Sequence, residues 1–149
     1  MAETEKNLAG CTIGRIRTDE EADYIDDRLV EFNLSRVPAD PGSDFLHAGT
    51  KATDGDGNIV GGCIGGNTPW NVGFIDLMWV DERYRGKGLG SALLTELENV
   101  LKEDGCYLIL LDTFDWQARG FYEKLGYTVS AVIEDCPQGH CRYYMQKRI

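Results

Sequence analysis

Hydrophobic and polar residues alternate along this chain in two rhythms, and each rhythm predicts one kind of element. Period-two alternation or a short apolar run, typical of a strand, occurs at residues 11–17, 45–53, 58–65, 73–80, 107–111, 127–133 and 142–147. Apolar residues recur every three or four positions, as on one face of a helix, at residues 19–35, 86–104 and 116–125. We therefore expect a mixed α/β (α+β) domain, with a central mixed sheet of about seven strands and helices on both faces.

Turn and cap residues separate these elements. Thr18 and Glu21 have the spacing of a capping box, in which a hydroxyl and a carboxylate each satisfy a free N–H at a helix start. Residues 36–43 contain two prolines and are expected to form a loop. Residues 54–57 (DGDG) are expected to form a hairpin turn, because glycine and aspartate tolerate a positive φ.

Composition narrows the class of protein. The 149 residues suit a single domain spanning residues 1–149, with residues 1–9 as a flexible start. A net charge of −10 argues against nucleic acid as a partner and suits a cationic one, although solubility alone also explains it. No apolar run approaches the roughly 18 residues of a membrane span, and the N-terminus does not resemble a signal peptide. We therefore expect a cytoplasmic protein that does not bind membranes.

A basic, glycine-rich segment, Arg85–Ser91 (RGKGLGS), lies between an apolar strand and an amphipathic helix. The first N–H groups of a helix are free and carry partial positive charge, and glycines let a phosphate approach the backbone. A P-loop would need Ser or Thr where Gly88 follows Gly-Lys. A dinucleotide fingerprint would need a third glycine at Ser91 or Leu93. The segment therefore predicts a phosphate cradle of another kind.

The remaining pattern, R-x-x-G-x-G at Arg85, Gly88 and Gly90, resembles the pyrophosphate-binding motif of the GNAT superfamily of N-acetyltransferases. A second segment, Ala118–Tyr127 (ARGFYEKLGY), resembles that family's A-x-x-F-Y-x-x-x-G-[FY] motif. The resemblance implies the acyl-CoA N-acyltransferase fold and direct transfer of an acetyl group from acetyl-CoA to an amine. Asp115 stands where the family often has Asn.

The resemblance also implies which residues contact acetyl-CoA. A strand that splays from its neighbour frees backbone N–H groups for the acetyl carbonyl, and the glycine loop holds the pyrophosphate. Mapped onto this sequence, the acetyl-CoA contacts are Met78, Trp79, Val80, Arg85, Gly86, Lys87, Gly88, Leu89, Gly90, Ser91, Asp115 and Ala118.

Two side chains are candidates for the chemistry. By resemblance the Tyr122 hydroxyl lies near the thioester sulfur, while its helical spacing with Ala118 and Leu125 is also that of a core residue. Tyrosine is a weaker acid than a thiol, so we expect Tyr122 to act first as a hydrogen-bond donor. Asp76 interrupts an apolar strand on the face of Met78 and Val80. Asp76 is a candidate base for the amine, or a group that only binds its charge.

The other candidate groups favour no metal site. The five cysteines are scattered, and Cys136, His140 and Cys141 have neither a fourth ligand nor the spacing of a common zinc site. We therefore expect no metal and interpret residues 136–141 as a surface loop, with His140, Glu134 and Asp135 as alternative borders of the acceptor site. His47 receives no role.

The acceptor amine is left open by the sequence. It belongs to a small molecule, a lysine or an N-terminus, and a cationic acceptor and a homodimer are both compatible with the sequence. Two other functions are alternatives: a non-catalytic acyl-CoA-binding module, and transfer of a different acyl group.

Overall fold

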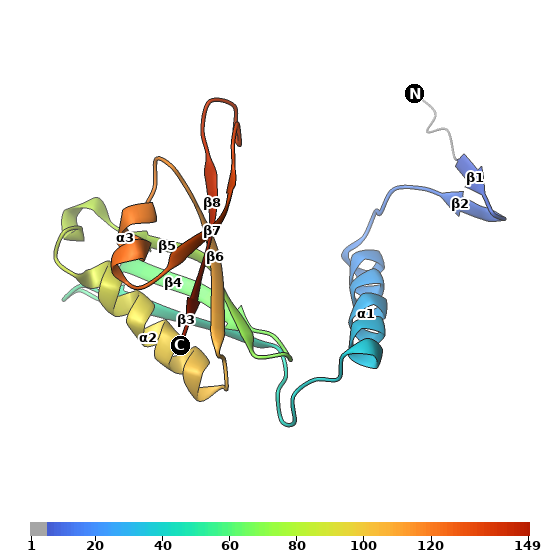
Figure 1. The fold of residues 1–149 in the computed structure, drawn as a ribbon, viewed down its shortest axis with the longest axis horizontal. Coiled ribbons are helices and arrows are strands. Elements are labelled where there is room, and N and C mark those ends of the chain that lie inside the picture. The colour runs from blue at the N-terminus through green and yellow to red at the C-terminus, as the bar shows by residue number, and fades with distance from the viewer. Residues whose placement is uncertain (1–5) are drawn as a thin grey trace. The chain divides into compact units, whose positions relative to one another are not determined.

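The computed structural model describes residues 6–149, which form two compact units that meet at the bond between Pro38 and Ala39. In the first unit, β1 (Lys6–Leu8) pairs antiparallel with β2 (Cys11–Ile13), and α1 (Asp19–Arg36) follows (Figure 1). The strand expected at residues 11–17 is therefore shorter. Of the start that we expected to be flexible, residues 6–8 form β1, and residues 1–5 lie outside the described residues.

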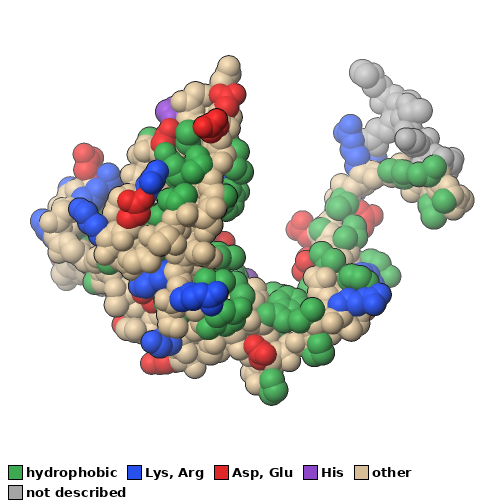
Figure 2. All heavy atoms as spheres, in the orientation of Figure 1, with side chains coloured by type: hydrophobic (Ala, Val, Ile, Leu, Met, Phe, Trp, Pro, Cys, Tyr) green, Lys and Arg blue, Asp and Glu red, His purple; other side chains and the backbone are tan. Residues whose placement is uncertain are grey.

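Helix α1 begins as the capping spacing predicts. The Thr18 hydroxyl accepts from the Glu21 N–H at 3.3 Å, and the Glu21 carboxylate reaches back to the N–H of Arg17 at 2.7 Å. The apolar stripe of this helix is exposed: Ile25, Leu29 and Phe32 are each more than half accessible, and Figure 2 shows hydrophobic side chains on its surface.

The second unit is a mixed sheet with helices packed on it. Its elements are β3 (Leu46–Thr53), β4 (Ile59–Asn67), β5 (Val72–Val80), a short 3₁₀ turn η1 (Glu82–Tyr84), α2 (Leu89–Glu103), β6 (Leu108–Phe114), α3 (Arg119–Lys124), β7 (Thr128–Ile133) and β8 (Arg142–Arg148). The strand order is β3-β4-β5-β6-β8-β7, and only β5 and β6 are parallel. The prediction of a mixed α/β fold is confirmed. The sheet has six strands rather than about seven, because β2 pairs with β1 in the first unit.

One core joins the sheet to α2 and α3. The apolar side of α2 packs on β3, β4 and β5, and β6, β8 and α3 add residues to the same cluster. The buried members of the cluster are Cys63, Ile75, Leu93, Leu94, Leu97, Leu101, Cys106, Ile109, Leu111, Tyr122, Tyr127 and Met145.

One charged side chain of α2, Glu98, is also buried. Glu98 accepts from the Tyr127 hydroxyl at 2.9 Å and from the Lys147 ammonium at 2.7 Å. A buried carboxylate is tolerated only when it is paired and hydrogen-bonded, and here both oxygens have a donor. The link ties α2 to β8 and to the turn after α3.

Two irregularities in β5 open the sheet. Leu77 pairs with Ile64 of β4 and Ile75 pairs with Gly65, so Asp76 is the extra residue of a β-bulge. On its other side β5 pairs with β6 only over Val72–Phe74. Beyond Phe74 the two strands separate, and a gap opens at the carboxyl ends of this parallel pair.

Candidate active site

A cleft of about 810 Å³ occupies the gap between β5 and β6. Its walls come from the second half of β5, the glycine loop and start of α2, the end of β6, and the start of α3. The cleft brings together all the predicted site residues except Lys87 and Asp115. Those that line it are Asp76, Met78, Trp79, Val80, Arg85, Gly86, Gly88, Leu89, Gly90, Ser91, Ala118 and Tyr122.

Backbone groups of β5 face this gap. The N–H of Asp81 donates to the Val60 carbonyl, which fixes the phase of the β4–β5 ladder. Antiparallel ladders alternate, so Trp79 and Leu77 bond to β4, and the amides of Met78 and Val80 point to the open edge. The Val80 carbonyl is on that edge, since it accepts from Arg85 Nε at 2.9 Å. The N–H of Trp79 is therefore directed at β4, and Trp79 lines the cleft through its other atoms.

The glycine loop has the backbone that its sequence predicts. Gly86 and Gly88 adopt φ values of +72° and +81°, which favour glycine. Gly88 is the N-cap of α2 and supplies no side chain to it, so the first N–H groups of this 15-residue helix are uncapped. Such an end attracts an anion, and here it lines the cleft.

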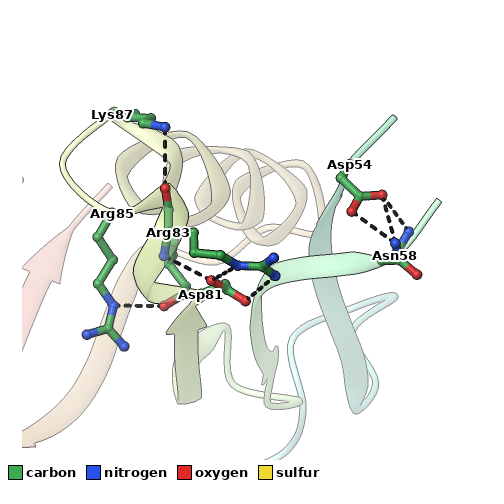
Figure 3. A network of polar contacts seen from close by, with 7 residues as sticks. Asp54, Asn58, Asp81, Arg83, Arg85 and Lys87 are labelled. Carbon is green, nitrogen blue, oxygen red and sulfur yellow. Dashed lines mark hydrogen bonds and ion pairs between the residues drawn. The ribbon is translucent and has the colours of Figure 1, made fainter. Parts of the chain in front are cut away.

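Three basic residues surround this helix end, each held differently (Figure 3). The Arg83 guanidinium donates two hydrogen bonds, of 3.0 and 2.9 Å, to the Asp81 carboxylate. These bonds lower the pKa of Asp81 to about 2. Arg85 reaches back to the Val80 carbonyl, and the Lys87 ammonium rests on the Arg83 carbonyl at 3.3 Å. Figure 2 shows basic side chains gathered at this end of the second unit. The local positive charge predicted within an acidic chain is therefore present, although Lys87 lies outside the cleft wall.

Gly90 has a different role from the other two glycines. A Cβ at this position would lie 2.9 Å from the Met78 methyl and 3.5 Å from the Phe121 ring. Gly90 therefore allows the start of α2 to approach both β5 and α3 closely.

Tyr122 is both a core residue and a cleft residue, so the two interpretations of its spacing are compatible. Its side chain is only 7% exposed, and its ring packs edge-on against Phe121 and Tyr127. Burial, with smaller contributions from Cys63 and Asp112, raises its pKa to about 12. Among the described residues its hydroxyl has no hydrogen-bond partner, and it borders the cleft, where it can donate to a ligand.

Asp76 lies at the bulge and is exposed to the cleft. The bulge interrupts the alternation that placed Asp76 on the face of Met78 and Val80, yet the cleft still includes all three. Across the gap, Asp112 of β6 also lines the cleft, and its carboxylate pairs with Arg142 at 2.7 Å. Among the described residues the Asp76 carboxylate has no ion-pair partner, which leaves it available to an acceptor amine.

Asp115 does not line the cleft. One carboxylate oxygen lies 2.9 Å from His140 Nδ1, and the other accepts from the Cys141 N–H at 3.0 Å. Burial raises the pKa of this carboxyl, but the Cys141 N–H and His140 together outweigh it, so the net pKa is lowered. Asp115 therefore anchors the exposed turn 134–141, and its assignment to acetyl-CoA stays a prediction. The described residues contain no group of three or more His, Cys, Asp or Glu side chains arranged for a metal ion.

Several cleft residues were missed by the sequence analysis. Tyr84, Thr113, Phe114 and Gln117 line the cleft, and the sequence around them carries no motif that would have singled them out. Trp116 also lines it, stacked on Phe114 with ring centroids 4.5 Å apart. Gln117 is an exposed residue before a helix, and nothing in the sequence distinguishes it from other such residues. Only its hydrogen bonds show that its side chain is held in one orientation.

Comparisons with known proteins agree with this geometry. The family model "Acetyltransferase (GNAT) family" matches residues 16–127. Blasticidin-S acetyltransferase of Streptomyces morookaense is 35% identical over 117 residues, which cover 78% of this chain and 85% of that protein. The crystal structure of an acetyltransferase from Bacillus cereus has a TM-score of 0.82 and 37% identity, covering 92% of this chain and 97% of that one. An aminoglycoside 6'-N-acetyltransferase complexed with coenzyme A shares the fold at a TM-score of 0.59 and 21% identity, over 69% of this chain and 73% of that one.

No helix in the described part of the chain is both long and apolar enough to cross a membrane.

Proposed function

Since the chain belongs to the GNAT family of acetyltransferases, we propose that it transfers the acetyl group of acetyl-CoA directly to a primary amine. The observation that carries the proposal is the cleft itself. It places two free β5 amides, an uncapped helix start and the Tyr122 hydroxyl around one space. Each is a hydrogen-bond donor, as a thioester with a pyrophosphate tail requires.

The glycine loop fits the diphosphate of the donor. The N–H groups at the start of α2 supply directed donors, and the helix dipole favours negative charge there. Gly86 and Gly88 leave the approach to these groups free of side chains. Arg85 and Lys87 add positive charge at the same end of the unit.

The acetyl carbonyl fits the open edge of β5. The N–H groups of Met78 and Val80 point into the gap, where they can donate to the carbonyl oxygen as it gains negative charge. A fixed donor of this kind is worth about 3 kcal/mol to the rate. Trp79 does not contribute its N–H, because that group bonds to β4.

Tyr122 serves as a donor to the thioester sulfur. With a pKa of about 12, against about 8.5 for a thiol, transfer of its proton to the thiolate would be uphill by about 5 kcal/mol. A hydrogen bond without full transfer stabilises the leaving sulfur and keeps the hydroxyl protonated throughout. Asp76, exposed on the opposite wall, receives the amine and its proton or positive charge.

The acceptor is a cationic amine of a small molecule or of a polypeptide. The exposed Asp76 carboxylate at the cleft and the net charge of −10 both favour a positively charged acceptor. The similarity to a relative named blasticidin-S acetyltransferase favours a small molecule over a polypeptide as the acceptor.

A thiol-release assay tests the proposal. Purified protein is mixed with acetyl-CoA and a panel containing blasticidin S, a polyamine, an aminoglycoside and a lysine peptide, and free thiol is measured. We expect release with at least one amine and a product that is heavier by one acetyl group. A protein that binds acetyl-CoA tightly but acetylates none of a broad panel would favour the non-catalytic module. Release with propionyl-CoA at an equal rate would favour a wider acyl range.

A further inference from the structure

Gln117 lines the cleft just before α3, and one end of its amide is fixed by the protein. Its Oε1 accepts from the Phe114 N–H at 2.9 Å and from the Thr113 hydroxyl at 3.2 Å. Thr113 is itself buried, and its hydroxyl also accepts from the Ala118 N–H. The hydroxyl that holds Gln117 is therefore fixed by the backbone. The side chain is therefore held in one position at the end of β6.

These contacts also identify which atom of the Gln117 amide is the oxygen and which is the nitrogen. A backbone N–H can only donate, so the atom that it contacts must be the carbonyl oxygen. The NH₂ group is then the other end, and among the described residues it makes no hydrogen bond. An amide donor without a partner thus remains on the wall of the cleft.

Asp115 cannot supply this hydrogen-bond donor to the cleft. Both of its carboxylate oxygens are taken by His140 and Cys141 of the exposed turn, and it does not line the cleft. A carboxylate would also offer only acceptors, whereas Gln117 offers a donor. Two residues that are close in sequence thus have separate roles, one toward the turn and one toward the cleft.

We propose that the Gln117 NH₂ group donates a hydrogen bond to an amide carbonyl in the pantetheine arm of acetyl-CoA. The inference rests on the proposed function, which places the donor substrate in this cleft. A neutral NH₂ suits a neutral carbonyl, whereas the phosphates are served by the helix start and the basic residues on the other wall. The arm crosses the space between the two walls, with β5 amides on one side and Gln117 on the other.

Binding of coenzyme A by calorimetry tests this inference without any acceptor. For Gln117→Ala we expect the Kd for coenzyme A to rise about tenfold, the equivalent of one hydrogen bond. For Gln117→Glu we expect a larger rise, because an acceptor then faces the carbonyl. The nucleotide half of coenzyme A, which lacks the arm, should bind all three proteins equally.

Gln138→Glu is the matched control, since Gln138 is exposed in the turn 134–141 and the substitution adds the same charge away from the cleft. Its Kd should equal that of the wild type. Unchanged coenzyme A binding by both Gln117 variants would overturn the inference, as would an equal loss for the nucleotide half. Failure of the wild type to bind coenzyme A at all would instead overturn the proposed function.

Discussion

The two walls of the cleft are built from different parts of the polypeptide. On the β5–α2 wall the groups that face the ligand space are main-chain N–H groups, exposed by a bulge, a strand separation and two glycines of positive φ. On the β6–α3 wall they are side chains, chiefly Tyr122 and Gln117, each oriented by its own contacts. We therefore expect the first wall to be more sensitive to changes of its backbone than to most side-chain changes, and the second wall to show the reverse.

The largest effect should come from a change to the main-chain wall. Gly88→Val places a β-branched residue at φ +81°, which costs about 2 kcal/mol in strain or shifts the loop. We expect the Kd for coenzyme A to rise about 30-fold, measured by calorimetry.

Gly139→Val is the matched control for that change, because Gly139 has the same φ of +81° and equally open surroundings in the exposed turn. It should lower the melting temperature to a similar degree and leave coenzyme A binding intact. Equal binding losses for both variants would mean that general destabilisation, and not the cradle, explains the result.

The side-chain wall should lose rate and keep affinity. Tyr122→Phe removes the hydroxyl that faces the cleft but keeps the ring packing, so we expect kcat to fall at least tenfold with little change in the Kd for acetyl-CoA. Tyr127→Phe removes a neighbouring hydroxyl whose one hydrogen bond within residues 6–149 is to Glu98, and it should lower stability while leaving kcat nearly unchanged. An unaltered kcat for Tyr122→Phe would remove this residue from the mechanism.

Asp76 tests whether the bulge brings chemistry to the main-chain wall. Asp76→Asn should lower kcat/KM about fivefold and flatten the acidic limb of the pH–rate profile, if the carboxylate takes the amine's proton. Asp112→Asn, across the gap and paired with Arg142, should leave that limb in place. An acidic limb that persists in Asp76→Asn would restrict Asp76 to binding the acceptor's charge.

Asp115→Asn should have a small effect on the cleft. Because Asp115 holds the turn 134–141, we expect faster hydrogen exchange at the Cys141 amide and a Kd for coenzyme A within about twofold of the wild type. A tenfold loss of coenzyme A affinity would return this residue to the donor site, where the family motif placed it.

The alkaline side of the pH profile should not depend on Tyr122. Its pKa of about 12 lies above the ordinary value of about 10, so the folded protein keeps the phenol protonated and able to donate as the pH rises through 10. The stability gained from this group is lost only as the pH rises from about 10 toward 12. We expect wild type and Tyr122→Phe to have alkaline limbs of the same shape between about pH 8 and pH 10, in single-turnover measurements.

The main-chain wall could be predicted from the sequence, because glycine at Gly86, Gly88 and Gly90 records a backbone requirement in the residue type itself. The start of α1 could be predicted for a similar reason, since capping is local. The orientation of Asp115 could not, because it depends on hydrogen bonds to residues 25 and 26 positions away. The orientation of Gln117 could not either, because no motif marks its partners Thr113 and Phe114, although they are only four and three positions away. The bulge at Asp76 was also invisible, since an extra residue in a strand appears only when the partner strand is in place.

The bulge has a consequence for how this sheet tolerates change. A strand with strict alternation would continue its pairing to the end and present its amides to a neighbour, and the sheet would be continuous. Inserting one residue at position 76 offsets β5 by a single step relative to β4. That offset leaves the rest of the strand in register with β4 while its free edge faces open space. The entrance for a ligand therefore lies on the stretch of β5 that carries one extra residue against β4 and has left β6.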